Sequence, residues 1–573
     1  MKSKMNSGSQ PTFNKSQKKT DTGKNTHFNA DWKAELDAVT PRYLVPLPFI
    51  ILTVLFILTG VLLFDAKLFL MSDDADYIIE AYKFVHEGVY PTGRSSLYTV
   101  VLALPVAIFG TQIVILKCFS FLCALVGFLI LAYSLKNKVS GWALYPVLVL
   151  SVINCSIQYY SSSNLSEAFF MMIQYAYIAI VFALINKLKT NTSGNINRYW
   201  LVVGLMSLLI SISKNIAIVA PVGLCVYFLL KKEWKNSFWA MLSFLIFKIP
   251  YEIFLRLAFT RNTLISQWDQ VMAKNLYHHE HGMETFSGFI DRFLANSKIY
   301  LSQITLNEFG FNISNSSLTA ITICFVLLLL YGLIHAYKKN NYIFFIGIYT
   351  AAICAGTFFA LQPAIYQGRI IIIVVPLLFL LSLYSILALL EKLNKNMPHF
   401  SIISVSIILF FLLITNIKRT SDKISETFPV FAENIRTQPF YGYTNDWISY
   451  LEMGSWIKQN IPDSIPIAAR KPNSLTVYSG GRPFVGIYSF PTNLNANQLL
   501  EKLKKENIKY LVVASIRANA EFSAPNNIIT TIHNYIAKIE SAYPGTFRLV
   551  HKTGKEEPCL LAEIKYPKVL KPM

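Results

Sequence analysis

Apolar residues in this chain fall into long runs that short polar segments separate. Most runs approach 20 residues, the length that an α-helix needs to cross a hydrocarbon core of about 30 Å. The pattern therefore predicts an α-helical membrane protein with eleven spanning helices. Their expected ranges are 43–64, 113–135, 142–160, 167–186, 199–213, 215–230, 237–259, 316–337, 341–361, 370–390 and 400–417.

One further apolar run, residues 97–109, is too short to cross, and Pro105 interrupts it. We expect this segment to form a helix that lies along the outer membrane interface. Counting it as a crossing would place Lys136 and Lys138 outside and would invert every later loop. Loops rich in Lys and Arg generally stay on the cytoplasmic side of a membrane, so we reject that topology.

Basic residues predict the orientation of the spans. The segment before the first span is rich in Lys and Arg, so we expect the N-terminus to be cytoplasmic and, with an odd number of spans, the C-terminus to be outside. Lys418 and Arg419, expected just outside, are exceptions. The loops expected inside are all basic, and they carry Lys136, Lys138, Lys187, Lys189, Arg198, Lys231, Lys232, Lys235, Lys338, Lys339, Lys392 and Lys395.

The polar stretches predict the domain organisation. Residues 1–42 form a cytoplasmic basic tail, and residues 43–417 form a transmembrane domain with outer loops at 65–112 and 260–315. Residues 418–573 form a small soluble α/β domain outside the membrane. In that domain we expect helices near 446–460, 496–506 and 527–541 and strands near 510–514, 546–551 and 559–565.

Composition agrees with a membrane protein. The chain of 573 residues is 53% hydrophobic with mean hydropathy +0.42. Its net charge of +20 does not indicate nucleic-acid binding, because the Lys and Arg residues lie between apolar runs, where they orient spans. Six of the seven Cys residues lie within apolar runs, so neither a disulfide framework nor a zinc spacing follows.

The first outer loop carries three carboxylates within four residues, Asp73, Asp74 and Asp76, followed by Tyr77. Like charges this close favour a site that binds a cation or raises a pKa. A solvated acidic turn at the start of a helix is the simpler alternative. Their position at the outer membrane surface favours a functional site.

Four basic residues are expected near the same level: Arg94, Lys117, Lys214 and Arg369. Lys214 lies between spans of only about 15 residues, or about 22 Å of helix, so we expect the tip of this hairpin to be recessed in a cavity. The alternative for each cation is an interfacial anchor.

Further charges lie near or within the spans. Glu167 follows a Ser-rich segment at the start of one span. Lys248, Glu252 and Arg256 share one face of another span, which predicts either a structural ion network or a ligand site. The run 277–281 contains three His and one Glu, but adjacent His side chains cannot all reach one metal ion, so we expect a polar loop there.

These motifs resemble the polyprenyl-phosphate-dependent membrane glycosyltransferases of the GT-C fold, in particular the group with protein O-mannosyltransferases and the lipid A aminoarabinose transferase. That group has an Asp-Glu-x-x-Tyr motif in its first outer loop, which matches residues 73–77 with Asp74 in place of Glu. Its interfacial helix ends in Phe-Gly with a basic residue seven positions on, matched by Phe109-Gly110 and Lys117.

Later parts of the chain extend the resemblance. Ser166-Glu167 precedes the fourth span, Lys214 precedes a later span, and Arg369 leads a helix that contains Pro376. Two departures occur: Ile replaces the group's usual Tyr after Arg369, and Ser95-Ser96-Leu97 replaces its Pro-Pro-Leu.

The resemblance implies transfer of a hexose or pentose, with inversion, from a polyprenyl-phosphate donor to a glycan, lipid or protein hydroxyl at the outer face of a bacterial inner membrane. Asp73 is then the base, and Asp74 or Asp76 orients it or binds a divalent cation. The implied donor-phosphate ligands are Lys117, Lys214, Arg369 and Arg256. The expected substrate contacts are Asp76, Tyr77 and Glu167, together with Arg94 and Glu252, which are included for their position in the chain and not for the resemblance.

Two other classes of function fit intramembrane charges. A transporter or flippase of a lipid-linked or anionic substrate predicts inverted repeats and broken helices at matching positions. The sequence has neither, and such a protein has little use for a large outer domain. A scaffold whose outer domain binds partners would not depend on Asp73.

Overall fold

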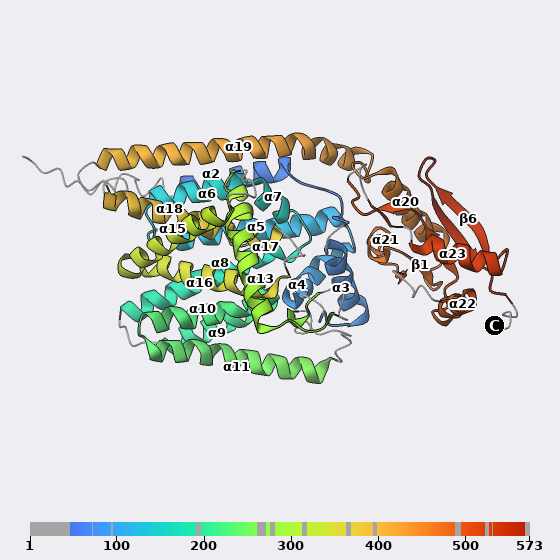
Figure 1. The fold of residues 1–573 in the computed structure, drawn as a ribbon, viewed down its shortest axis with the longest axis horizontal. Coiled ribbons are helices and arrows are strands. Elements are labelled where there is room, and N and C mark those ends of the chain that lie inside the picture. The colour runs from blue at the N-terminus through green and yellow to red at the C-terminus, as the bar shows by residue number, and fades with distance from the viewer. Residues whose placement is uncertain are drawn as a thin grey trace, which may run out of the picture. The chain divides into compact units, whose positions relative to one another are not determined.

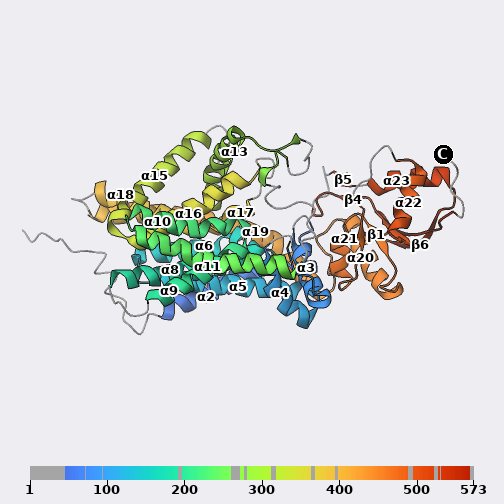
Figure 2. The same cartoon turned by 90° about the horizontal axis from the view of Figure 1, so that it is seen from below.

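The computed structural model is mainly helical, with a small sheet near the C-terminus (Figures 1 and 2). This agrees with the fold class that the sequence predicts. The residues that the structure describes are 46–70, 73–92, 95–190, 196–259, 271–275, 281–311, 318–362, 368–393, 398–487, 494–521, 527–529 and 531–567.

Every predicted span is helical over most of its described residues, although the spans 142–160 and 370–390 are interrupted at Asn154 and at residues 373–374. Of the described helices, eight are long and apolar enough to cross a membrane, and the bent pair α6–α7 is a ninth if it counts as one span. Two further predicted spans are shorter helices, so the total of eleven stays a prediction. The long helices are α5 (Ile113–Leu135), α8 (Ser166–Lys189), α9 (Ile196–Ser213), α11 (Trp234–Ala258), α15 (Leu318–Lys339), α16 (Asn341–Ala360), α18 (Val375–Leu393) and α19 (Pro398–Arg436). The others are α2 (Pro46–Leu62), α6 (Gly141–Ile153), α7 (Cys155–Ser161), and η2 (Asn215–Ile218) with α10 (Val219–Leu230).

A bend of 63° separates α6 from α7 within the predicted span 142–160. Asn154 lies at the break in an extended conformation and caps α7, because its Oδ1 accepts a hydrogen bond of 3.0 Å from the backbone amide of Ile157. Asn is one of the preferred residues at such a cap. The Asn154 side chain also donates to the carbonyl of Glu308, at 2.9 Å, which ties the break to the second outer loop.

The first outer loop folds into two helices, α3 (Asp74–Glu87) and α4 (Ser96–Phe109), which pack against each other. The rings of Tyr77 and Tyr98 meet edge to face at 5.1 Å between centroids. Helix α4 coincides with the predicted interfacial helix, and its placement along the interface stays a prediction. The second outer loop contains α13 (Phe286–Lys298), η4 (Ile299–Ile304) and α14 (Thr305–Glu308), none of which the sequence predicted.

Helix α19 continues without a break past residue 417, where we placed the end of the transmembrane domain (Figure 1). Arg419 lies on this helix, and its Nη2 is 3.3 Å from Glu308 Oε1 in the second outer loop and 3.1 Å from Ser156 Oγ on α7. The positive charge of Arg419, which is expected on the outer side, is therefore offset by the carboxylate of Glu308.

Near the C-terminus a five-stranded sheet has the order β2-β1-β3-β7-β6, in which β1 pairs in parallel with β2 and β3, and β7 pairs antiparallel with β3 and β6. The strands are β1 (Ile467–Ala469), β2 (Val485–Gly486), β3 (Tyr510–Val513), β6 (Phe547–Thr553) and β7 (Cys559–Ile564). A separate two-stranded sheet contains β4 (Ile516–Arg517) and β5 (Ile528–Ile529). The helices are α20 (Asn445–Asn460), α21 (Pro472–Tyr478), α22 (Ala496–Lys505) and α23 (Thr531–Ala542).

The two faces of the larger sheet bury different helices. Ala468 and Leu511 pack with α22 and α23, whereas Ile467 and Val512 pack with α20 and α21 (Figure 2). This is the alternation that a β-strand imposes on successive side chains. The core on the α20 side also contains Tyr77, so the C-terminal domain shares a core with the first outer loop.

Candidate active site

The first residue of the acidic motif, Asp73, precedes α3 and forms an ion pair with Arg369. Arg369 Nη2 lies 2.8 Å from Asp73 Oδ2. The Asp73 side chain is 31% exposed and the Arg369 side chain is 18% exposed, so the pair is screened from most solvent. Arg369 begins α17 (Arg369–Ile372), the short helix before α18.

A second ion pair lies next to the first. Lys214 Nζ is 2.9 Å from Glu167 Oε1 and 3.4 Å from Ser166 Oγ. Lys214 stands in extended conformation between α9 and η2, and its side chain is 14% exposed. Glu167 is buried in the first turn of α8 and also interacts electrostatically with Arg369.

Tyr77 connects the two ion pairs. Its hydroxyl lies 3.4 Å from Ser95 Oγ and 3.4 Å from Ser166 Oγ. Burial, followed by the negative charge of Glu167, raises the pKa of Tyr77 to about 12, so the phenol stays protonated and remains a hydrogen-bond donor at neutral pH. The structure thus gathers four chain segments around two carboxylates and two cations.

Asp74 lies in a different environment from Asp73. It is fully buried, and its Oδ2 accepts a hydrogen bond of 3.3 Å from the backbone amide of Phe69. Its Oδ1 has no hydrogen-bond partner within the described part of the chain. Burial raises the pKa of Asp74 to about 6, even though Lys117 acts in the opposite direction.

Lys117 lies beneath the loop that leads to α3, and only 1% of it is exposed. Its ammonium donates to the carbonyls of Asp65, at 2.9 Å, and of Lys67, and lies 4.0 Å from Asp65 Oδ2. Burial alone would raise the pKa of Asp65, but Lys117 and Lys67 outweigh it and hold that pKa below its usual value. In this structure Lys117 therefore supports the loop backbone.

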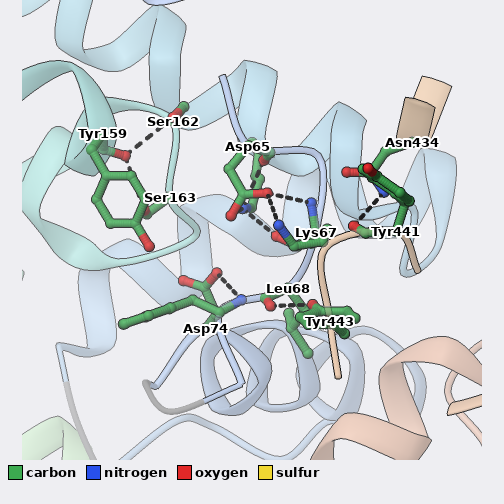
Figure 3. Close-up of polar contacts among 12 residues, drawn as sticks. Asp65, Lys67, Leu68, Asp74, Tyr159, Ser162, Ser163, Asn434, Tyr441 and Tyr443 are labelled. Atoms are coloured by element: carbon green, nitrogen blue, oxygen red, sulfur yellow. Dashed lines mark hydrogen bonds and ion pairs between the residues drawn. The ribbon is translucent and has the colours of Figure 1, made fainter. Parts of the chain in front are cut away.

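The C-terminal domain holds the same loop from the other side. The Tyr443 hydroxyl donates to the carbonyl of Leu68, and the amide of Leu68 donates to the Tyr478 hydroxyl at 3.2 Å (Figure 3). The third aspartate of the motif, Asp76, accepts a hydrogen bond from Asn473. None of these three partner residues was found from the sequence, because each lies more than 300 residues from the residue it contacts.

The segment Ser479-Gly480-Gly481-Arg482 also reaches α3. A Cβ built on Gly481 would lie 2.3 Å from the ring of Tyr82, and Gly481 has a φ of +101°. Both facts require glycine at this position. This close approach gives a physical reason for the glycine pair that the sequence places after α21.

Two other predicted site residues lie on α11. Glu252 pairs with Lys248 at 2.8 Å, and Arg256 is exposed on α11. Their proposed roles stay predictions, as does that of Lys117. Arg94 and residues 277–280 lie outside the described residues. Within the described ranges, no group of three or more His, Cys, Asp or Glu side chains is arranged to hold a metal ion, and the expected divalent cation stays a prediction.

No sequence family matches the chain, and no curated protein sequence matches it. Solved structures do match. ArnT from Cupriavidus metallidurans in the apo state is 12% identical with a TM-score of 0.54, covering 90% of this chain and 97% of that chain. The same enzyme bound to undecaprenyl phosphate is 11% identical with a TM-score of 0.53, over the same shares of the two chains.

The archaeal oligosaccharyltransferase AglB from Archaeoglobus fulgidus, in complex with an inhibitory peptide and a dolichol-phosphate, also matches. It is 12% identical with a TM-score of 0.51, covering 88% of this chain and 79% of that chain. The chain therefore has the GT-C fold of polyprenyl-phosphate-dependent membrane glycosyltransferases, as the sequence resemblance predicted.

Proposed function

We propose that the protein is a glycosyltransferase that moves a sugar from a polyprenyl-phosphate donor to an acceptor hydroxyl at the outer face of a bacterial inner membrane. The observation that carries this proposal is the Asp73–Arg369 ion pair beside the Glu167–Lys214 ion pair. The fold supports it, because neighbours with the same fold were solved with undecaprenyl phosphate and with dolichol-phosphate. A glycan, a lipid or a protein is the acceptor.

The two cations would bind the donor phosphate. Arg369 begins α17 and Lys214 lies between α9 and η2, so the two cations come from different parts of the chain, and each is paired with a carboxylate. A phosphate offers several strong acceptor oxygens, and a guanidinium suits them because it can bind two at once. Cations held there stabilise the negative charge that develops on the leaving phosphate.

Asp73 would act as the general base. When Arg369 turns toward the donor phosphate, Asp73 loses this ion pair and becomes more basic. The acceptor hydroxyl then attacks the anomeric carbon and gives its proton to Asp73, while the bond from that carbon to the phosphate oxygen breaks and the electron pair leaves with the phosphate. Attack opposite the leaving group inverts the anomeric centre.

Tyr77 and Glu167 would orient this site. The Tyr77 phenol is neutral and can donate to a sugar or acceptor oxygen. Glu167 holds Lys214 in place through its 2.9 Å contact. Lys117 contributes indirectly, because it binds the backbone of the loop that precedes Asp73.

The proposal is tested by incubating the purified full-length protein with a panel of polyprenyl-phosphate sugars and a membrane extract as the source of acceptor. Mass spectrometry measures the loss of each lipid-linked sugar. We expect one donor to be consumed by the wild type and to be spared by Asp73→Asn, while a matched change at the exposed Asp422 has no effect. Equal consumption by the wild type and Asp73→Asn would contradict the proposal.

A further inference from the structure

A cavity of about 340 Å³ lies between the C-terminal ends of α5 and α8. Its lining includes Tyr133, Lys136 and Lys138 from the first helix and the loop that follows it, and Ala183 and Asn186 from the second. The candidate active site lies near the opposite ends of both helices, at Lys117 and Glu167. Helices of 23 and 24 residues are more than 30 Å long. The cavity is therefore a separate site.

The packing of α5 against α8 explains why the space exists. At Gly127 the helices come so close that an added Cβ would lie 2.9 Å from the Cα of Met172. Toward their C-terminal ends, the small side chains of Ala179 and Ala183 leave room beside Tyr133. The result is an open groove on the flank of the helix pair.

Two lysines that line the groove, Lys136 and Lys138, and Lys189 on the same helix as Ala183 each lie over an aromatic ring. Lys138 Nζ lies 4.7 Å from the centroid of the Tyr342 ring, and Lys189 Nζ lies 5.2 Å from the same centroid. Lys136 Nζ lies 5.9 Å from the centroid of Phe49. Among the residues that the structure describes, none of these three lysines forms an ion pair with a carboxylate. An aromatic face attracts a cation but does not neutralise it, so the groove carries uncompensated positive charge.

We propose that this groove binds the phosphate-bearing headgroup of an anionic phospholipid. The positive charge of the groove favours an anionic ligand, and the volume of the groove lies within the range of small-molecule sites. A lipid is favoured over a soluble anion because an exposed apolar stripe on α5, formed by Leu122 and Val126, leads into the groove at Tyr133 and offers a track for an acyl chain. The orientation expected from the basic loops puts the groove in the cytoplasmic leaflet, where anionic lipids are enriched.

The experiment compares lipid retention by the full-length protein in native mass spectrometry. Phosphatidylglycerol is the anionic probe, phosphatidylcholine is the zwitterionic control, and inorganic phosphate tests a soluble source of the same group. The variant Lys136→Gln with Lys138→Gln removes two groove cations. The matched control, Lys232→Gln with Lys235→Gln, removes two exposed lysines at the start of α11, which is expected on the same side.

We expect the groove variant to bind phosphatidylglycerol about 30-fold more weakly than the wild type, since it loses two lysines that contribute independently. The affinity of the control variant should change by about twofold or less, because its lysines do not line the groove. A second variant, Ala183→Trp, fills the groove without changing its charge and should also lose the lipid. The proposal is overturned if both groove variants, checked to be folded, retain phosphatidylglycerol as the wild type does. Equal retention of phosphatidylcholine, or displacement of the lipid by millimolar inorganic phosphate, would also overturn it.

Discussion

Arg369 and Asp73 lie 2.8 Å apart although 296 positions separate them along the chain. The pair joins the start of α3 in the first outer loop to the start of α17, the short helix before α18. Each residue offsets the charge of the other. We propose that a phosphate bound by Arg369 would also release Asp73, which would link donor binding to the activation of the base.

The Lys214–Glu167 pair predicts different consequences for stability and for donor binding. Lys214→Met removes the ion-pair partner of the buried Glu167 carboxylate, and breaking a buried ion pair typically costs about 3–5 kcal/mol. We expect a clearly lower thermal midpoint for the purified variant in detergent. The double variant Lys214→Met with Glu167→Gln should recover most of the midpoint but not the affinity for the donor. Recovery of both would assign Lys214 a purely structural role.

The raised pKa of Asp74 predicts that the stability of the protein depends on pH. Burial raises its pKa from 3.8 to about 6, so the native protein binds this proton more tightly than the unfolded chain does. The stability that the proton supplies is complete below the unfolded pKa and is lost as the pH rises through about 6, and the shift corresponds to about 3 kcal/mol.

Asp74→Asn keeps the shape of the side chain and stays neutral. The thermal midpoint of this variant relative to the wild type should therefore rise between about pH 5 and pH 8. Thermal unfolding across this range measures the difference, and Asp422→Asn is the matched control at an exposed carboxylate. A difference that stays constant or falls with pH would show that Asp74 is not protonated in the native protein.

The hydrogen bond from Tyr443 to Leu68 allows a prediction of how the C-terminal domain affects the candidate active site. Tyr443→Phe keeps the ring but removes the hydroxyl that donates to Leu68, a contact that typically contributes about 1–3 kcal/mol when it is buried. We expect kcat to fall severalfold while the donor Kd changes little, because the loop before Asp73 is less well held. Tyr441→Phe is the control, since that ring is 43% exposed. A parallel loss in both variants would argue against a positioning role.

The sequence predicted the helices well because hydropathy is a local property. Each of the eleven apolar runs is helical over most of its described residues, and the helix and strand patterns of the C-terminal domain reappear as α20, α22, β3 and β7. The predicted ends of these elements were less accurate. The helix expected over 527–541 begins at Thr531, because Ile528 and Ile529 form a strand that pairs with β4. Short elements such as β1 and β2 carry too few residues for a periodic pattern.

The site could be predicted only in part. The motif and the cations were visible in the sequence, but their pairing was not, because it depends on which helices meet. Asp74 and Asp73 are adjacent in the chain yet lie in different environments, one fully buried and one paired with Arg369. Asp65 and Lys67 carried no signal, because charges that follow a span usually serve as interfacial anchors.

The orientation of the spans predicts an outer C-terminus. A reporter that is active only in the periplasm should be active when it is fused after Met573, since the basic loops place the N-terminus inside and the expected number of spans is odd. The same reporter fused after Asn137 should be inactive. The reverse pattern would place the candidate active site on the cytoplasmic side.

The central claim is that Asp73 accepts the proton of the acceptor hydroxyl. Asp73→Asn keeps the size of the side chain and can still accept a hydrogen bond from Arg369, so we expect a folded protein with nearly unchanged donor binding. Loss of a positioned base typically lowers the rate by about 10²–10⁴-fold.

The most direct test measures single-turnover transfer and donor Kd for the wild type, Asp73→Asn and the neighbouring Asp76→Asn on the same preparation. The account predicts that only Asp73→Asn loses about two orders of magnitude or more in transfer rate while its donor Kd stays within about threefold of the wild type. Transfer by Asp73→Asn at a rate within a few-fold of the wild type would contradict the account.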